Sequence, residues 1–273
     1  MAVATAQTSG ERSVASRPLA GRHAVVTGAS RGIGFAIAQE LARLGADLTI
    51  MGRTAAPLRQ AQAKLAVAGG TQVKSIVADM SVESSVIAAF AESSQALGEP
   101  AILVNNAGSA ESAAFARTDP SLWERMIAQN LNSTYYCARA VVPAMLTHGF
   151  GRIVNVASTS GLKGYAYVTA YCAAKHGVVG LTRALAVELA KTGVTVNAVC
   201  PGYTDTPMIA AAIAAIAAKT GRGADEARAG LAASNPMGRL IEPEEVAAVV
   251  GWLCLPEAGA ITGAAIPIAG GEI

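Results

Sequence analysis

Tyr171 and Lys175 stand four residues apart in YCAAK, within a stretch whose composition predicts a helix. Side chains at this spacing lie on one face of a helix. A phenol with a pKa of about 10 is a poor base at neutral pH, but an adjacent ammonium stabilises its phenolate. The pair predicts a tyrosine that gives or takes a proton with help from the lysine, although a surface tyrosine above a lysine has the same spacing.

Two further polar positions could serve such a tyrosine. Ser158 follows the apolar run RIVNV, where its hydroxyl would lie at the carboxyl edge of a sheet and could hydrogen-bond the substrate oxygen that Tyr171 protonates. Thr159 and Ser160 are the local alternatives. Asn130 is polar in the otherwise apolar neighbourhood of WERMIAQNL, where it could hold a water for proton relay, or simply cap the helix or hydrogen-bond within the core.

These residues must be positioned by the alternation of short β-branched runs with longer Ala/Leu-rich stretches that begins at His23. Runs such as HAVVT and ILVNN lack alternating polarity, as expected of strands buried on both faces. The pattern predicts an α/β fold with a parallel sheet covered by helices on both sides. The expected strands are His23–Thr27, Asp47–Met51, Lys74–Ala78, Ile102–Asn105, Arg152–Val156, Val194–Val199 and Ala265–Ile268.

A glycine-rich turn, TGASRGIG, directly follows the first expected strand and opens the first expected helix. Glycines here permit a tight turn, let the backbone approach a pyrophosphate, and leave the positive end of the helix aimed at the anion. Such a turn alone is a weak signal, but its place between a first strand and a first helix predicts a dinucleotide site. The expected contacts are Gly28, Ser30, Arg31, Gly32, Ile33 and Gly34.

The end of the second strand offers Gly52, Arg53 and Thr54, where an Asp or Glu would accept hydrogen bonds from a free ribose 2′-hydroxyl. The nearest acid, Asp47, lies at the opposite end of that strand. Arg53 together with Arg31 would present two guanidinium groups to a 2′-phosphate. The sequence therefore favours NADP(H), with NAD(H) still possible because an acid is not obligatory and both arginines could be solvated.

The third and fourth expected strands also end in candidate cofactor contacts, because the adenosine half must lie at carboxyl ends. Asp79, with Met80 beside it, could accept a hydrogen bond from the adenine amino group. Asn106, Ala107 and Gly108 follow the fourth strand.

Two segments fall outside the alternation. Residues 1–20 are small and polar, which predicts a disordered tail before a single domain of residues 21–273. Residues 203–240 are Ala-rich, too long for a tight connection and too apolar for a solvated loop. We expect this second segment to form a small helical lid over the substrate, the alternative being a helical insertion that only pads the surface.

Composition excludes several classes of function. The formal charge of +2 gives no broad basic face for nucleic acid, and no stretch is apolar enough for a membrane span or signal peptide. The histidines show no metal-ligand spacing, so no metal is expected. Buried thiols in a reducing compartment fit the four scattered cysteines, Cys137, Cys172, Cys200 and Cys254, and the cytoplasm is the default location.

Taken together, TGASRGIG, NNAG, Asn130, the spacing from Ser158 to Tyr171, YxxxK and the PG at Pro201 resemble the short-chain dehydrogenase/reductase family from about residue 20 onward. The resemblance implies a Rossmann-type domain, a homotetramer, and an oxidoreductase of ketones and secondary alcohols. It implies that Tyr171 is the general acid/base, that Lys175 lowers its pKa and binds the cofactor ribose, that Ser158 orients the carbonyl, and that Asn130 completes a proton relay. It adds to the cofactor contacts Tyr171, Lys175, Pro201, Gly202, Thr204 and Thr206.

Within the family, GRIVNVAS and NPMGRLIEPEEVA look most like 3-oxoacyl thioester reductases and 3-hydroxyacyl-CoA dehydrogenases. Reductases that act on acyl carrier protein often have an arginine shortly before the GRI run and another after the active-site helix. Gly149 and Thr192 stand there instead, with Lys191 adjacent to the second. A coenzyme A thioester is therefore favoured over a carrier-protein thioester.

Two other functions compete with this one. The same four residues would serve a ring or aryl ketone that fits the pocket. A nucleotide-binding partner subunit without turnover is less favoured, because Tyr171 and Lys175 are both present.

Overall fold

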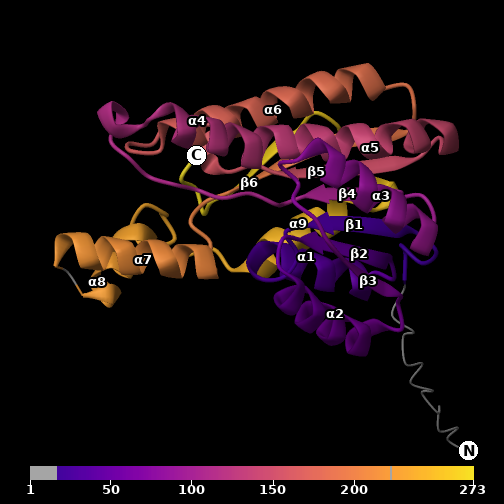
Figure 1. The fold of residues 1–273 in the computed structure, drawn as a ribbon, viewed down its shortest axis with the longest axis horizontal. Coiled ribbons are helices and arrows are strands. Elements are labelled where there is room, and N and C mark those ends of the chain that lie inside the picture. Colours follow the sequence, from indigo (N-terminus) through magenta and orange to yellow (C-terminus); the bar gives the residue numbers. More distant parts are fainter. Residues whose placement is uncertain (1–16, 222) are drawn as a thin grey trace, which may run out of the picture.

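Seven parallel strands form one sheet in the order β3-β2-β1-β4-β5-β6-β7, in a computed structural model that describes residues 17–221 and 223–273 (Figure 1). The strands are β1 (His23–Thr27), β2 (Asp47–Gly52), β3 (Val73–Val77), β4 (Ile102–Asn105), β5 (Gly151–Val156), β6 (Val194–Pro201) and β7 (Ala265–Ile268). The prediction of a seven-stranded, doubly wound α/β sheet is confirmed. β3 lies one residue earlier than expected, and β6 continues to Pro201.

The strand order reverses between β1 and β4, which lie side by side at the centre of the sheet. β1 is followed by β2 and β3 on one side, and β4 by β5, β6 and β7 on the other. The loops that leave the carboxyl ends of β1 and β4 therefore turn away from each other, and the gap between them is where doubly wound sheets bind ligands.

Helices cover both faces of the sheet, as Figure 1 shows. One face carries α1 (Gly32–Arg43), α2 (Ala55–Gly69) and α9 (Pro243–Leu253). The other carries α3 (Glu83–Leu97), α5 (Ser133–His148) and α6 (Thr169–Leu189). Neighbouring β1 residues serve opposite faces: Val25 packs with α3 and α5, and Ala24 and Val26 pack with α1 and α9. This explains why the strands are apolar throughout.

The remaining helices lie toward the carboxyl edge. α4 (Pro120–Ile127) runs into a single π-helical turn, Ala128–Asn132, before α5 begins. α7 (Pro207–Thr220) and α8 (Ala224–Ala232) project beyond the sheet, in orange in Figure 1. Among α7 residues Ile213 is buried, and most of its alanines are exposed. No helix in residues 17–221 and 223–273 is long and apolar enough to cross a bilayer.

The folded domain begins before residue 21. Leu19 is fully buried in the core with α1, and its backbone N–H donates to the Leu44 carbonyl at 2.9 Å. Residues 17–20 therefore belong to the domain rather than to the predicted tail, because burial of the apolar Leu19 side chain stabilises the folded state. Residues 1–16 of that predicted tail lie outside the described residues.

A buried polar chain fixes the amino end of β1. His23 Nδ1 lies 2.6 Å from the Gly98 carbonyl oxygen, and its Nε2 lies 2.9 Å from Thr49 Oγ1. Ser93 Oγ donates to Thr49 Oγ1 at 2.9 Å. A neutral ring with its proton on Nδ1 satisfies every one of these contacts. Burial lowers the pKa of His23, with the Gly98 hydrogen bond opposing the shift.

This lowered pKa makes stability depend on pH. Below a pH of about 6.5, His23 is protonated in the unfolded chain but stays neutral in the folded chain. The free energy of unfolding therefore falls as the pH drops from about 7.5 to about 5.5. The loss has an upper limit of about 1.4 kcal/mol per pH unit. Thermal unfolding at the two pH values should show a smaller pH effect in His23→Asn than in the wild type. The exposed His148→Asn should behave as wild type, and an equal pH effect in His23→Asn would contradict this assignment.

Candidate active site

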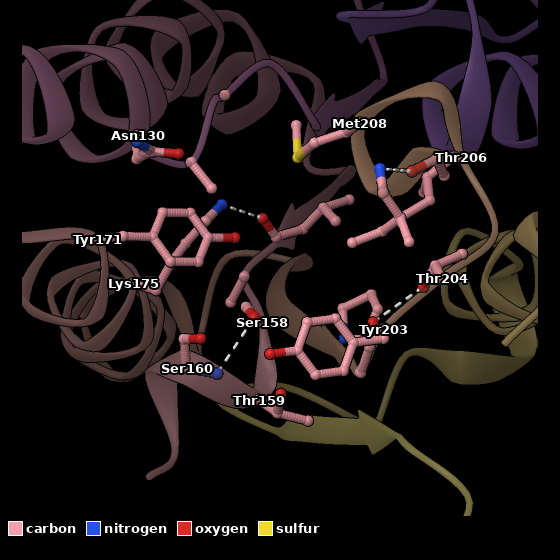
Figure 2. Close-up of a pocket in the computed structure, with 18 of the residues that line it drawn as sticks. Asn130, Ser158, Thr159, Ser160, Tyr171, Lys175, Tyr203, Thr204, Thr206 and Met208 are labelled. Carbon is pink, nitrogen blue, oxygen red and sulfur yellow. Dashed lines mark hydrogen bonds between the residues drawn. The ribbon is translucent and has the colours of Figure 1, made fainter. Parts of the chain in front are cut away.

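Two adjoining cavities open at the carboxyl edge of the sheet. The larger, of about 500 Å³, lies at the ends of β1 to β4, and the smaller, of about 210 Å³, at the ends of β4 to β6. Both are lined by Ile33, Asn106, Gly108, Thr206 and Met208. The two cavities therefore form one continuous cleft, and Figure 2 looks into its smaller end.

The glycine turn after β1 is packed against the end of β4. Gly28 has φ +66°, and a Cβ there would lie 2.9 Å from Ala107 Cα. A Cβ on Gly34 would lie 2.3 Å from Asn106 Nδ2. α1 begins at Gly32 with no side-chain cap, and its first residues, Gly32, Ile33 and Gly34, line the larger cavity, so first-turn N–H groups without a helical partner are left at that cavity. A Cβ on Gly32 would lie 3.2 Å from Thr206 Cγ2, which lines the same cavity, so glycine keeps this mouth of the cavity open for a pyrophosphate.

Asn106 braces the glycine turn from beneath. Its Nδ2 donates to the carbonyl oxygens of Thr27 at 3.0 Å and Gly28 at 3.1 Å. The backbone N–H groups of Asn106 and Ala107 both donate to Thr27 Oγ1 at 3.0 Å. The sequence predicts Asn106 as a cofactor contact, and the structure adds that its side chain ties the end of β4 to the glycine turn.

The far end of the larger cavity carries the charges expected there. Arg31, Arg53, Thr54 and Asp79 line it, and both arginines are exposed. Asp47 lies at the opposite end of β2, where its Oδ1 accepts from the Gln72 N–H at 2.8 Å. Burial alone would raise the pKa of Asp79, but hydrogen bonds from Ser81 and the charge of Arg53 outweigh it, so the pKa is lowered. The geometry suits a ligand with a phosphate at this end.

Tyr171 and Lys175 lie on one face of α6, as their spacing predicts. Both line the smaller cavity, and Lys175 Nζ is 5.7 Å from the centre of the Tyr171 ring. Lys175 is buried and donates to the Val156 carbonyl oxygen at 2.8 Å. That bond anchors the ammonium to the end of β5.

Burial dominates the electrostatics of this pair. It raises the pKa of Tyr171 to about 12, and a hydrogen bond with Ser158 acts in the opposite direction. Burial also lowers the pKa of Lys175 to about 8. In the chain by itself, burial is thus the largest influence on the pKa of Tyr171, and the lowering by Lys175 that the spacing predicts stays a prediction.

Ser158 lies two residues beyond β5 and is the serine beside Tyr171. Its Oγ accepts from the Ser160 backbone N–H at 3.1 Å, which starts the short turn Thr159–Gly161. The alternative Thr159 is buried, and its hydroxyl lies 2.7 Å from the Tyr165 hydroxyl, away from Tyr171. Ser160 also lines the cavity. Of the three hydroxyls, Ser158 alone in the described chain acts on the pKa of Tyr171, which it lowers.

Asn130 is buried in the π-helical turn, and its side chain is fully engaged. Nδ2 donates to the Ser109 carbonyl at 3.0 Å and to the Met126 carbonyl at 2.9 Å, and Oδ1 accepts from the Ser109 N–H at 3.3 Å. A Cβ on Gly108 would lie 2.6 Å from Asn130 Oδ1 and 3.8 Å from Lys175 Nζ. The buried hydrogen-bonding role is thus observed, and a π-turn is a common device beside functional sites.

The loop after β6 closes the cleft. Pro201, Gly202, Thr204 and Thr206 all line the smaller cavity. Thr204 Oγ1 donates to the Gly202 carbonyl oxygen at 3.0 Å, and Thr206 Oγ1 caps α7 by accepting from the Ile209 N–H. These two threonines therefore shape the loop through their own hydrogen bonds.

Several residues that line the smaller cavity are not singled out by the sequence analysis, and Tyr165, Tyr203 and Met208 are the largest of them. Tyr203 lies inside PGYTDT, between residues that the sequence does single out. The Tyr165 and Tyr203 rings meet edge to face with centroids 6.4 Å apart. Among described residues, no cluster of acids, histidines or cysteines has the arrangement of a metal site.

Comparisons with known proteins agree on one family. A family model described as short chain dehydrogenase matches residues 22–216. A 3-oxoacyl acyl-carrier-protein reductase of Pseudomonas aeruginosa is 42% identical over 253 residues, covering 93% of this chain and 98% of that protein. A D-beta-hydroxybutyrate dehydrogenase of Cupriavidus necator is 39% identical over 257 residues, covering 93% and 99%. A solved actinorhodin polyketide ketoreductase with NADPH superposes with a TM-score of 0.89 at 38% identity, covering 92% of this chain and 97% of that one.

The packing of the glycine turn predicts a sharp difference between two glycines. Gly34→Ala places a methyl 2.3 Å from Asn106 Nδ2 and 2.5 Å from the Gly28 carbonyl oxygen. It should destabilise the protein by about 1–3 kcal/mol, as overpacking does. Gly180→Ala in α6 meets nothing within 4 Å and serves as the control, with equal or slightly higher stability. Thermal unfolding measures both, and equal melting temperatures for the two variants would refute the close approach.

Proposed function

Since this chain belongs to the short-chain dehydrogenase/reductase family, and is an oxidoreductase that interconverts ketones and secondary alcohols, we propose that it acts on a 3-oxoacyl or 3-hydroxyacyl thioester with NADP(H). The observation that carries the proposal is the meeting of Ser158, Tyr171 and Lys175 in a cavity continuous with the larger cavity.

The proposed chemistry places the substrate carbonyl oxygen between two hydroxyls. Ser158 holds that oxygen by a hydrogen bond, and Tyr171 donates a proton to it. A phenol with a pKa raised to about 12 is protonated at neutral pH, which suits this donation. The nicotinamide supplies the hydride when bound. In the reverse direction the alcohol proton returns to Tyr171, which must then be a phenolate.

Lys175 serves the phenolate and the cofactor together. An ammonium has three hydrogens, and one is used by the Val156 carbonyl. The other two are available to the ribose hydroxyls of the nicotinamide and, through them, to Tyr171. Asn130 supports this end of the site by fixing Ser109 and the adjoining Gly108. We propose that it also takes part in a proton relay.

Arg53 and Arg31 support NADP(H) over NAD(H). Both are exposed and line the larger cavity. Arg53 directly follows β2, at the position where an acid would accept from a ribose hydroxyl, and Arg31 lies in the glycine turn after β1. The solved ketoreductase of similar fold is titled as binding NADPH. Two guanidinium groups would bind a 2′-phosphate by charge-assisted hydrogen bonds.

A coenzyme A thioester is favoured over a carrier-protein thioester. Gly149, at one position where carrier-protein reductases often have arginine, ends α5 with φ +62°, a conformation in which a side chain is strained. At the other position, the Thr192 hydroxyl donates to the Leu189 carbonyl oxygen, leaving Lys191 as the cation there. The surface therefore offers less positive charge to an acidic carrier.

A second candidate is a ring or aryl ketone. Tyr165 and Tyr203 place two aromatic rings along the smaller cavity, and such rings stack on planar substrates. The similarity to a polyketide ketoreductase favours the same candidate. The lid formed by α7 and α8, the homotetramer and the cytoplasmic location stay predictions.

Cofactor choice should depend on Arg53. Replacing it by Asp removes a phosphate partner and adds an acceptor for a ribose hydroxyl, so the ratio of kcat/KM for NADPH to that for NADH should fall by at least about tenfold, the equivalent of one charged hydrogen bond. Arg59→Asp makes the same change of charge on the exposed side of α2 and should leave the ratio unchanged. Equal ratios in wild type and Arg53→Asp would rule out the phosphate role.

Turnover should depend on the Tyr171 hydroxyl. Tyr171→Phe should lower kcat at least about 100-fold, the usual size of a general acid contribution, with NADPH binding retained. Tyr167→Phe, at an exposed position four residues earlier, is the matched control. If Tyr171→Phe keeps near wild-type kcat, the acid/base role is wrong.

The substrate class is tested by comparing kcat/KM for acetoacetyl-CoA, the same acyl group on a carrier protein, and a panel of cyclic ketones. We expect acetoacetyl-CoA to be the best of the three. A higher value for the carrier-bound or the cyclic substrates would replace the thioester assignment.

A further inference from the structure

The last residues of the chain fold back beneath the smaller cavity. After β7, Gly270 has φ +58° and Gly271 φ +90°, and the Glu272 N–H donates to the Ala269 carbonyl at 3.1 Å. A Cβ on Gly270 would lie 2.0 Å from Asn235 Oδ1. Only glycine tolerates this combination of backbone and contact. The path of the segment is therefore fixed, and it delivers the side chain of Glu272 to one place.

That place is the buried wall behind the cavity. The Glu272 side chain is 4% exposed, its Oε1 pairs with Lys163 Nζ at 3.1 Å, and the same oxygen accepts from Tyr165. Its Oε2 is buried without a hydrogen-bond partner in the described residues. Burying a carboxylate is costly, and a lysine that is itself 40% exposed compensates it only in part. A buried carboxylate with one oxygen unpaired in the described residues points to a role other than stabilising the fold.

The chemistry of the partners sets the direction of the hydrogen bonds. A carboxylate only accepts, so the single phenol proton of Tyr165 goes to Glu272. The Tyr165 oxygen then accepts from the Thr159 hydroxyl, 2.7 Å away. Burial, followed by the hydrogen bond to Glu272, raises the pKa of Tyr165, which keeps this phenol protonated. A directed chain thus runs from Thr159 through Tyr165 to Glu272.

The other end of this hydrogen-bonded chain, at Thr159, lines the smaller cavity. Thr159 follows Ser158 directly and begins the turn that presents it. The N–H groups of Leu162 and Lys163 both donate to the Thr159 carbonyl, at 2.9 and 3.0 Å. Tyr165 itself lines the smaller cavity and meets Tyr203 edge to face. Whatever holds Thr159 and Tyr165 therefore fixes both the turn beside Tyr171 and one aromatic wall of the cavity.

We propose that Glu272 is a positioning residue, which through Tyr165 and Thr159 fixes the Ser158 turn and makes Tyr165 a determinant of substrate fit. This inference rests on the proposed function, because it concerns how the ketone is held. It assigns a role in the substrate site to the second-last residue of the chain.

The experiment compares Tyr165→Phe, Glu272→Ala and the double variant, with the exposed Glu257→Ala as the matched control. Each single variant should lower kcat/KM for the ketone by roughly tenfold, the effect of one buried charged hydrogen bond, with the KM for NADPH unchanged. Because both remove the same chain, the double variant should be no worse than the single ones. Glu272→Gln keeps an acceptor and should recover part of the loss.

Amide hydrogen exchange provides a readout that does not require turnover. Peptides spanning residues 158–165 should exchange faster in Tyr165→Phe and Glu272→Ala than in wild type or Glu257→Ala, because the turn loses its anchor. Unchanged exchange, unchanged kcat/KM, or losses that add in the double variant would each overturn the positioning role. A wild-type protein that turns over no ketone would instead overturn the proposed function, so the two failures are distinguishable.

Discussion

The contact between the glycine turn and the end of β4 is the constraint on which the rest of the cleft depends. Asn106 Nδ2 bridges the carbonyl oxygens of Thr27 and Gly28, and Gly34 packs onto the same amide with no room for a methyl. The sheet reverses its strand order between β1 and β4. The contact between the loops that follow these two strands therefore forms the wall that both cavities share, which includes Asn106. It places a helix N-terminus on one side and the Tyr171 face of α6 on the other.

Burial is the main influence on the pKa values of the two titratable groups at the reacting end of the cleft, Tyr171 and Lys175. Burial raises the pKa of Tyr171 to about 12 and lowers that of Lys175 to about 8, so at neutral pH the phenol keeps its proton and the lysine is still mostly an ammonium. A neutral phenol is ready to donate, and a lysine pinned to Val156 stands where a phenolate would need a cation. The same burial excludes water, which strengthens every hydrogen bond made to the substrate oxygen. Protonation of a ketone is thus the direction that the resting site favours.

Much of this arrangement could be predicted from sequence, because strand burial, the glycine turn and the YxxxK spacing are local patterns. The hydrogen bonds that individual side chains make could not be predicted in this way. An asparagine such as Asn130 can take part in a proton relay, but its amide donates to Ser109 and Met126. The π-helical turn that makes these bonds possible leaves no periodic pattern in the sequence. Glu272 reads as a polar end of the chain, and its burial depends on two positive-φ glycines and on Tyr165, over a hundred residues earlier. The burial that raises the pKa of Tyr171 is likewise not contained in the YxxxK spacing.

In the proposed reaction one cleft holds a dinucleotide beside a ketone, so that hydride passes to the carbonyl carbon while Tyr171 supplies the proton. The most direct measurement uses NADPH carrying deuterium at the transferred position of the nicotinamide, with acetoacetyl-CoA as substrate and mass spectrometry of the product. The account predicts one deuterium, bound to the carbinol carbon of the 3-hydroxyacyl product. A reduced product without deuterium at that carbon would contradict it.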